Sequence, residues 1–214
     1  MVFSAFLNAL QTWISRLAAL AGVAVLLIPL IGFRRLDRRA RGSTSGRLTA
    51  AVRWPFMLVM TVLFLSAGVL LWKPLPISLT LYWHTAALLG GGLLYFPAVS
   101  LYLWGYKTLG ANFGLSSGFA ASLYADHQLV QTGPFRYVRH PMYLGVILAA
   151  AGALLIFRTW AMLIFAPISL GIIFRARREE RLLAQAFGED WQAYKKRVPA
   201  WIPNLGKRGA SYVG

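Results

Sequence analysis

The sequence predicts an all-α, polytopic membrane protein with about five transmembrane helices, followed by a cytoplasmic helical segment. Of its 214 residues, 58% are hydrophobic and 13% are charged, and the mean hydropathy is +0.59. A soluble domain carries about 25% charged residues. Apolar runs close to the length of a bilayer crossing alternate with short basic segments, as in a chain that crosses a membrane repeatedly. We expect one membrane domain over residues 1–214.

The first three predicted spans lie in the N-terminal half, at 13–33, 55–72 and 81–104. The segment Lys73-Pro74-Leu75-Pro76 ends the second span, because proline has no backbone N–H and cannot continue a helix. Three glycines, 90–92, lie in the third span and permit another backbone to approach closely. We expect residues 1–105 to form a three-helix N-terminal part.

The last two predicted spans, 142–157 and 159–174, are separated only by Arg158. Each is shorter than the roughly 20 residues that a perpendicular crossing needs. We predict that they form a tight helical hairpin with its tip, at Arg158, at the outer face of the membrane.

The chain beyond the predicted hairpin is basic and amphipathic. Apolar residues at helical spacing predict a helix that ends at Gly188, and a second amphipathic piece spans 190–197 before Pro199 stops it. We expect residues 106–203 to form a C-terminal core and residues 204–214 to form a tail.

The distribution of basic residues predicts the orientation. The net charge is +16, with 22 Lys and Arg residues against 6 Asp and Glu residues. Five spans with the N-terminus outside place every Lys and Arg on the cytoplasmic side except Arg16, Lys73 and Arg158. That bias is the positive-inside signal. The charge therefore indicates control of topology and contact with anionic lipids, and we expect no nucleic-acid partner.

Two classes of feature are missing from the sequence. It contains no cysteine, which excludes a disulfide framework, a thiolate metal site and a cysteine nucleophile. Its N-terminus lacks a basic region followed by a small-residue cleavage site, so we expect the first apolar run to be a retained helix.

Polar and ionisable side chains concentrate in one stretch, Asp126–Gly145, which reads DHQLVQTGPFRYVRHPMYLG. The dipeptides Gly133-Pro134 and His140-Pro141 are turn signals within it. Ionisable groups at the edge of a bilayer are costly without partners, so such a cluster is a functional-site hypothesis. The pair Glu179-Glu180 follows the predicted hairpin and, by the predicted topology, lies on the same cytoplasmic side.

These residues resemble the signature of the isoprenylcysteine carboxyl methyltransferase and phospholipid methyltransferase superfamily. That signature has a His-x-Leu-Val lead, a Gly-Pro-Tyr-Arg-Tyr turn, an Arg-His-Pro-x-Tyr-x-Gly segment and a closing Glu-Glu pair. The chain carries these parts in order at His127–Val130, Gly133–Tyr137, Arg139–Gly145 and Glu179-Glu180. Phe135 stands where the family has tyrosine. The resemblance covers about 109–203 and implies that the C-terminal core is the catalytic core of an integral membrane methyltransferase.

The resemblance implies S-adenosylmethionine as the cofactor. Methyl transfer from its sulfonium needs no metal, but it needs donor and acceptor held close and aligned, and water excluded. Arg139, His140 and the helix N-terminus at Pro141 suit a carboxylate. Tyr137 and Tyr143 suit hydrogen bonds or stacking on adenine. The cofactor-binding residues expected from this resemblance are His127, Leu129, Val130, Gly133, Tyr137, Arg139, His140, Tyr143 and Glu180.

Arg175 and Glu179 are the predicted catalytic residues. They share one helix face at i, i+4, so Arg175 either orients an acidic acceptor or locks Glu179. Adjacent helical residues point about 100° apart, so Glu179 and Glu180 are expected to have different roles. An amine acceptor needs a base, which a glutamate supplies, whereas a carboxylate acceptor needs none.

The expected reaction is therefore methyl transfer to a lipophilic acceptor, either an isoprenylcysteine-type carboxylate or a phospholipid-type amine. Two alternatives stay open. A sterol-type membrane reductase that uses NADPH resembles this chain in its C-terminal half, but it has an Asn-Tyr form where Pro141-Met142-Tyr143 stands here. A non-enzymatic membrane scaffold would bind no cofactor.

The glycine run, the cellular location and the oligomeric state complete the expectations from the sequence. Glycines 90–92 suit helix packing, and they also resemble a segment linked to cofactor binding in the phospholipid methyltransferases. The expected location is a prokaryotic inner membrane with the site on the cytoplasmic side, although an endoplasmic-reticulum membrane obeys the same charge rule. The oligomeric state is left open.

Overall fold

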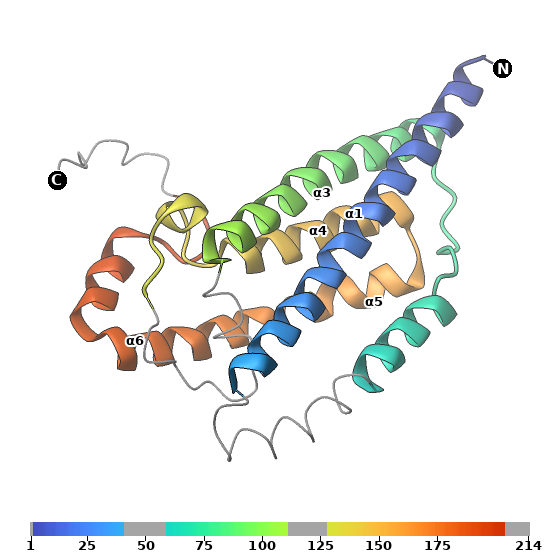
Figure 1. Ribbon diagram of the computed structural model, residues 1–214. Helices are drawn as coiled ribbons and strands as arrows, with labels where there is room; N and C mark the ends of the chain where they lie inside the picture. The colour runs from blue at the N-terminus through green and yellow to red at the C-terminus, as the bar shows by residue number, and fades with distance from the viewer. Residues whose placement is uncertain (1, 41–58, 111–127, 204–214) are drawn as a thin grey trace. The chain divides into compact units, whose positions relative to one another are not determined.

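The computed structural model describes residues 2–40, 59–110 and 128–203, and their regular secondary structure is helical (Figure 1). The helices are α1 (Val2–Ala40), a helix over Val59–Leu70, α3 (Leu81–Leu109), α4 (Pro141–Phe157), α5 (Trp160–Ser169) and α6 (Ile172–Arg197), with the 3-10 turn η2 (Gly133–Arg136) before α4. The all-α prediction is confirmed. The start of the predicted second span, most of the first basic loop, His127 and the tail 204–214 lie outside the described residues.

Several helix boundaries differ from the predicted spans. Helix α1 begins at Val2 where the predicted span begins at 13, and α3 continues to Leu109 where the predicted span ends at 104. The basic loop was predicted to begin at Arg34, but α1 continues to Ala40. Arginine, leucine and alanine are strong helix formers, and neither proline nor glycine interrupts 33–40. The predicted span 159–174 is also divided, since α5 ends at Ser169 and α6 begins at Ile172. Pro167 removes one helical donor, and the N–H of Leu170 bonds to its carbonyl at 3.1 Å in the tighter i→i−3 pattern that ends the helix.

The chain divides into two compact units, which are described separately. The first comprises Met1–Val99 and Ile147–Leu170, and the second comprises Ser100–Val146 and Gly171–Gly214. The division passes through α3 and α4, so each of these helices contributes to both units.

Close backbone packing of α3 against α4 marks the first unit. Leu88 and Ile156 are fully buried in its core. A Cβ atom added at Gly152 would lie 2.8 Å from the carbonyl oxygen of Gly91, whereas one added at Gly90 would meet nothing within 4 Å. Gly91 therefore has the helix-packing role that was one of the two interpretations of the glycine run. A hydrogen bond also ties α3 to α1, because the Tyr95 hydroxyl donates to the carbonyl of Ala18 at 2.7 Å.

The connection between α4 and α5 is short and well bonded. Arg158 has a positive φ of 48°, and its Nη2 lies 3.0 Å from Nε2 of His84 on α3. The N–H of Leu75 donates to the Arg158 carbonyl at 2.8 Å, and the N–H of Trp160 donates to the Lys73 carbonyl at 3.0 Å. The chain that follows the helix over Val59–Leu70 is thereby paired with this connection.

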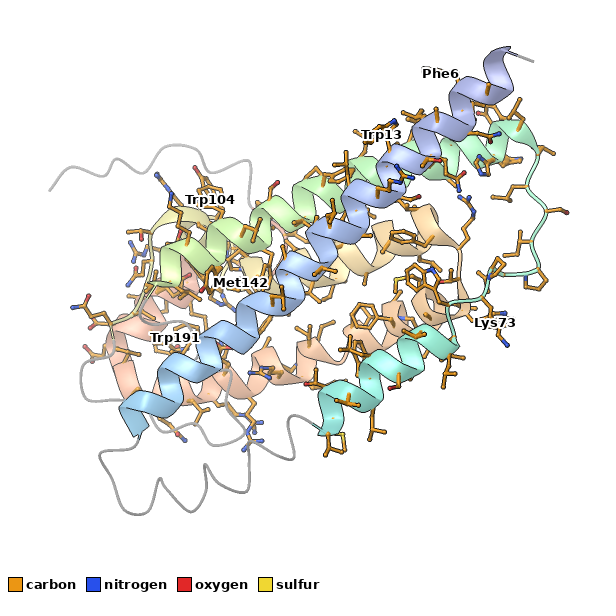
Figure 2. The ribbon with its side chains drawn as sticks, turned by 45° about the vertical axis from the view of Figure 1, so that its right-hand side comes forward. Phe6, Trp13, Lys73, Trp104, Met142 and Trp191 are labelled. Carbon is orange, nitrogen blue, oxygen red and sulfur yellow. The ribbon has the colours of Figure 1, made fainter. Side chains whose placement is uncertain are left out.

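Two helical stretches, Leu81–Leu109 and Trp160–Arg197, are long and apolar enough to cross a membrane. Large apolar side chains also lie on the outside of the helices, as Phe6 (60% exposed) and Trp13 (61% exposed) do on α1 (Figure 2). Exposed apolar surface of this extent is typical of a membrane or binding surface. The five-span arrangement and its orientation stay predictions.

Candidate functional site

The second unit carries the motif stretch, and the turn η2 is the first regular element in its described part. Gly133 has a φ of 57°, a conformation that glycine adopts without steric cost. A Cβ atom there would also lie 2.5 Å from Oγ1 of Thr108. Both the backbone conformation and the lack of space therefore favour glycine at this position. Pro134 and Phe135 are buried, and the N–H of Val138 bonds back to the Pro134 carbonyl at 3.2 Å. The turn thus fixes the chain that leads into Arg139.

Arg139 and His140 stand immediately before α4. Pro141 suits the first helical position, where no N–H is needed, and its ring sets φ for the helix. The backbone N–H groups of Arg139 and His140 donate to the carbonyls of Pro199 (2.9 Å) and Ala200 (3.2 Å). The segment that follows α6 therefore lies along the motif and satisfies its backbone.

Glu180 of α6 joins the two motif side chains. Its Oε1 accepts from Nε (3.0 Å) and Nη2 (2.8 Å) of Arg139 and lies 3.0 Å from Nε2 of His140. His140 is only 5% exposed. The other oxygen, Oε2, lies 3.7 Å from Nζ of Lys195. One carboxylate thus connects the start of α4 with both halves of α6.

These contacts determine the charge of Glu180. Burial alone would raise the pKa of Glu180. The hydrogen bonds from His140 and Arg139, together with the arginine charge, outweigh burial and lower that pKa from 4.5 to about 2. The carboxylate is therefore ionised at neutral pH.

Arg139 is enclosed by the second half of α6 and the segment after it. Its Nη1 donates to the carbonyls of Lys195 (3.1 Å) and Val198 (2.6 Å). Its guanidinium carbon lies 5.9 Å from the ring centre of Trp191, the α6 residue labelled in Figure 2. Trp191 is buried in a small core with Tyr194 and Val198. Gly188, at φ 48° and ψ −116°, breaks α6 where the sequence predicted a helix end. The second half of α6 then turns toward the motif, which the sequence did not predict.

A second polar network connects α4 with α6. The hydroxyl of Tyr143 donates to Oε2 of Glu179 at 2.7 Å and accepts from Nε of Arg175 at 3.0 Å. Glu179 and Glu180 therefore meet different partners, which agrees with their predicted separation around the helix. Arg175 and Glu179 both hydrogen-bond to the Tyr143 hydroxyl, which connects the two predicted catalytic residues.

Aromatic rings enclose His140 on two sides. The ring of Tyr143 is stacked on it at 5.6 Å between centres and 13° between planes. Trp201 approaches it at 5.3 Å. These ring contacts and the 3.0 Å contact of Nε2 with Oε1 of Glu180 together hold the imidazole in place.

The other predicted cofactor residues lie outside these two networks. Leu129 packs against the Trp191 core, and Val130 is half-buried. Tyr137 is 49% exposed, with its ring centre 6.3 Å from that of Trp104. Nothing is described for His127.

Sequence reasoning gave no role to Lys195 or Trp201, although the structure puts them beside Glu180 and His140. Lys195 lies four residues after Trp191 and so shares its helix face. That spacing in the sequence could have placed Lys195 on the same side of the helix as Trp191. Nothing in the pattern reveals that the chain after Gly188 returns to the motif.

Comparison with known proteins gives a consistent set of similarities. The phospholipid methyltransferase family matches residues 85–190. Protein-S-isoprenylcysteine O-methyltransferase of Schizosaccharomyces pombe is 31% identical over 110 residues, which is 50% of this chain and 47% of that protein. Methanethiol S-methyltransferase of Crocosphaera subtropica is 30% identical over 161 residues, 69% of this chain and 61% of that protein. The chain therefore matches less than two thirds of the length of each relative.

Proposed function

Since the chain belongs to the isoprenylcysteine carboxyl methyltransferase and phospholipid methyltransferase superfamily, we propose that it transfers a methyl group from S-adenosylmethionine to a lipophilic acceptor at the cytoplasmic face of a membrane. One observation carries the proposal. Arg139 and His140, from one part of the family signature, contact Glu180, from the other part, at 2.8–3.0 Å across 40 positions of sequence. Two separated parts of a signature that meet at one partly buried carboxylate indicate a functional site.

The charges of this site suit the cofactor. Bound S-adenosylmethionine would supply a methyl group already activated on a sulfonium. Glu180 is anionic at neutral pH, and among the described residues its Oε2 has only the 3.7 Å ion pair with Lys195. That oxygen is therefore available to an ammonium. Tyr143 and Trp201 bring two aromatic rings against His140, which itself contacts Oε1 of Glu180.

The second network supports a role on the acceptor side. Tyr143 donates to Glu179, which fixes the carboxylate, and Arg175 donates to Tyr143. In our proposal Glu179 takes the proton of an amine or thiol acceptor, and Arg175 pairs with a carboxylate acceptor. Relatives named for isoprenylcysteine and for methanethiol are both similar to this chain, which supports an acceptor of one of these two kinds, a carboxylate or a thiol.

The membrane arrangement is part of the proposal. Five spans with the N-terminus outside and a hairpin at Arg158 bring the motif and α6 to the side that carries most of the basic residues. The exposed apolar side chains support contact with lipid. A site at this face is open to a water-soluble cofactor and to a lipidic acceptor.

Calorimetric titration of S-adenosylhomocysteine and of NADPH into the purified protein in detergent tests the function. We expect saturable binding of S-adenosylhomocysteine and none of NADPH. Glu180→Ala removes the carboxylate that Arg139 and His140 share, so it is expected to abolish binding, whereas Glu189→Ala, at an exposed glutamate of the same helix, is expected to bind like the wild type. Binding of NADPH instead would move the protein to the reductases, and binding of neither ligand by folded protein would contradict the enzyme assignment.

A further inference from the structure

Most N–H donors of the Arg139 guanidinium are engaged in hydrogen bonds within the protein. Its side chain is 9% exposed, and four of its contacts are internal: two to Oε1 of Glu180 and one each to the carbonyls of Lys195 and Val198. A guanidinium has five N–H donors, and a bidentate contact with a ligand carboxylate would need two that lie side by side. Arg139 therefore acts as a positioning residue that fixes Glu180 and the second half of α6.

Glu180 has one occupied oxygen and one open oxygen. Oε1 receives the contacts of Arg139 and His140, whereas Oε2 faces Nζ of Lys195 at 3.7 Å. That separation exceeds hydrogen-bond length, so the two charges attract each other without a formed hydrogen bond. The site thus presents an anionic oxygen and an ammonium side by side, both capable of a closer partner.

Lys195 has a fixed backbone and an accessible head group. Its carbonyl accepts from Arg139, and the neighbouring Tyr194 is buried with its hydroxyl donating to the Phe135 carbonyl at 2.7 Å. The Lys195 side chain is nevertheless 47% exposed. An exposed ammonium with three donors, on a residue whose backbone is fixed, is suited to meet an incoming carboxylate.

We propose that Oε2 of Glu180 and Nζ of Lys195 together bind the α-amino-acid end of the methyl donor, with the ligand ammonium on Glu180 and the ligand carboxylate on Lys195. This inference rests on the proposed function. An α-amino acid carries its two opposite charges on a single carbon, so it presents them side by side as this pair does. Its insertion replaces one loose ion pair with two charge-assisted hydrogen bonds.

The proposal assigns Lys195 to one end of the ligand only, and that makes it testable by calorimetry. S-adenosylhomocysteine carries the amino-acid end, whereas 5′-methylthioadenosine has the nucleoside and sulfur without it. Lys195→Met is expected to weaken binding of S-adenosylhomocysteine about tenfold or more and to leave 5′-methylthioadenosine unchanged. Lys195→Arg keeps the charge and is expected to restore most of the affinity. Lys196→Met, at the exposed neighbouring lysine, is the matched control and is expected to bind both ligands like the wild type.

Three results would overturn the proposal. Unchanged or tighter binding of S-adenosylhomocysteine by Lys195→Met would show that Lys195 merely neutralises Glu180. An equal loss for both ligands would show that it acts on the fold of the site. Wild-type protein that binds neither ligand would remove the proposed function itself, which is distinct from a failure confined to the Lys195 variants.

Discussion

Glu180 illustrates how a single side chain holds distant parts of this chain together. Its carboxylate would be costly to bury alone, but Arg139 and His140 supply donors at 2.8–3.0 Å. The same two residues are anchored through their backbone N–H groups to Pro199 and Ala200. Loss of the Glu180 charge should therefore loosen the whole contact between α6 and the start of α4.

Acid should remove this contribution in a defined pH range. The pKa of Glu180 is about 2 in the folded protein, below its ordinary 4.5. A lowered folded-state pKa stabilises the folded protein fully above the ordinary value, and this contribution declines as the pH falls from 4.5 toward 2. We expect Glu180→Gln to lower the thermal stability at neutral pH and to reduce its further decline over that range, as measured by thermal unfolding in detergent.

The matched control for the acid experiment is Glu189→Gln, because Glu189 is exposed on the same helix. Its pH profile should follow the wild type. If Glu180→Gln and wild type lose stability in parallel below pH 4.5, Glu180 is not the group that responds to acid.

At the scale of elements, the helix boundaries that coincide with a proline, a glycine or a charged residue were predictable. Helix α4 begins at Pro141 and ends at Phe157, just before the charged Arg158. Helix α6 breaks at Gly188, which has a positive φ. The break at Leu170 was missed because it depends on an i→i−3 hydrogen bond to Pro167 inside an uninterrupted apolar run. The hydrophobic pattern of the sequence does not predict that hydrogen bond or the helix end that it forms.

The glycine contact between α3 and α4 gives a prediction for these elements. A methyl group at Gly152 would meet backbone atoms of Gly91 and Tyr95 at 2.8 Å, and backbone cannot move aside as a side chain does. We expect Gly152→Ala to destabilise the protein by about 1–3 kcal/mol, the usual cost of overpacking. Chemical unfolding followed by tryptophan fluorescence would measure it.

Gly90→Ala is the control for the same contact, since a methyl group there meets nothing within 4 Å. Alanine also has the better helix propensity, so this variant should be at least as stable as the wild type. Equal destabilisation by both variants would argue against close packing of α3 on α4 as the cause.

The candidate site was predictable in part for a similar reason. Its local pieces, the Gly133 turn and the Arg139-His140-Pro141 start of α4, are visible as residue types in order. Their long-range partners are not, because no local pattern places the carbonyls of Val198, Pro199 and Ala200 against Arg139 and His140. The resemblance to a family pointed to Glu180, but not to Lys195 beside it.

At the scale of the whole molecule, the predicted topology is open to a clean experiment. The sequence has no cysteine, so a single introduced thiol is labelled without background. We expect Lys73→Cys to react with a membrane-impermeant maleimide in intact cells, because Lys73 belongs to the predicted outer side. Lys196→Cys, on exposed α6 surface, should react only after the membrane is permeabilised. The reverse pattern would invert the orientation and place the motif on the outer side.

The hydrogen bonds from Arg139 and His140 to Pro199 and Ala200 also bear on how the protein is made. The ribosome releases the complete motif before it releases those two carbonyl groups, because α5 and α6 lie between them in the sequence. A nascent chain that stops before Pro199 therefore contains every residue of the family signature and still lacks the backbone contacts that hold Arg139 and His140 in place. We therefore expect the backbone contacts of Arg139 and His140 to form only in the last steps of synthesis, after Pro199 and Ala200 have left the ribosome.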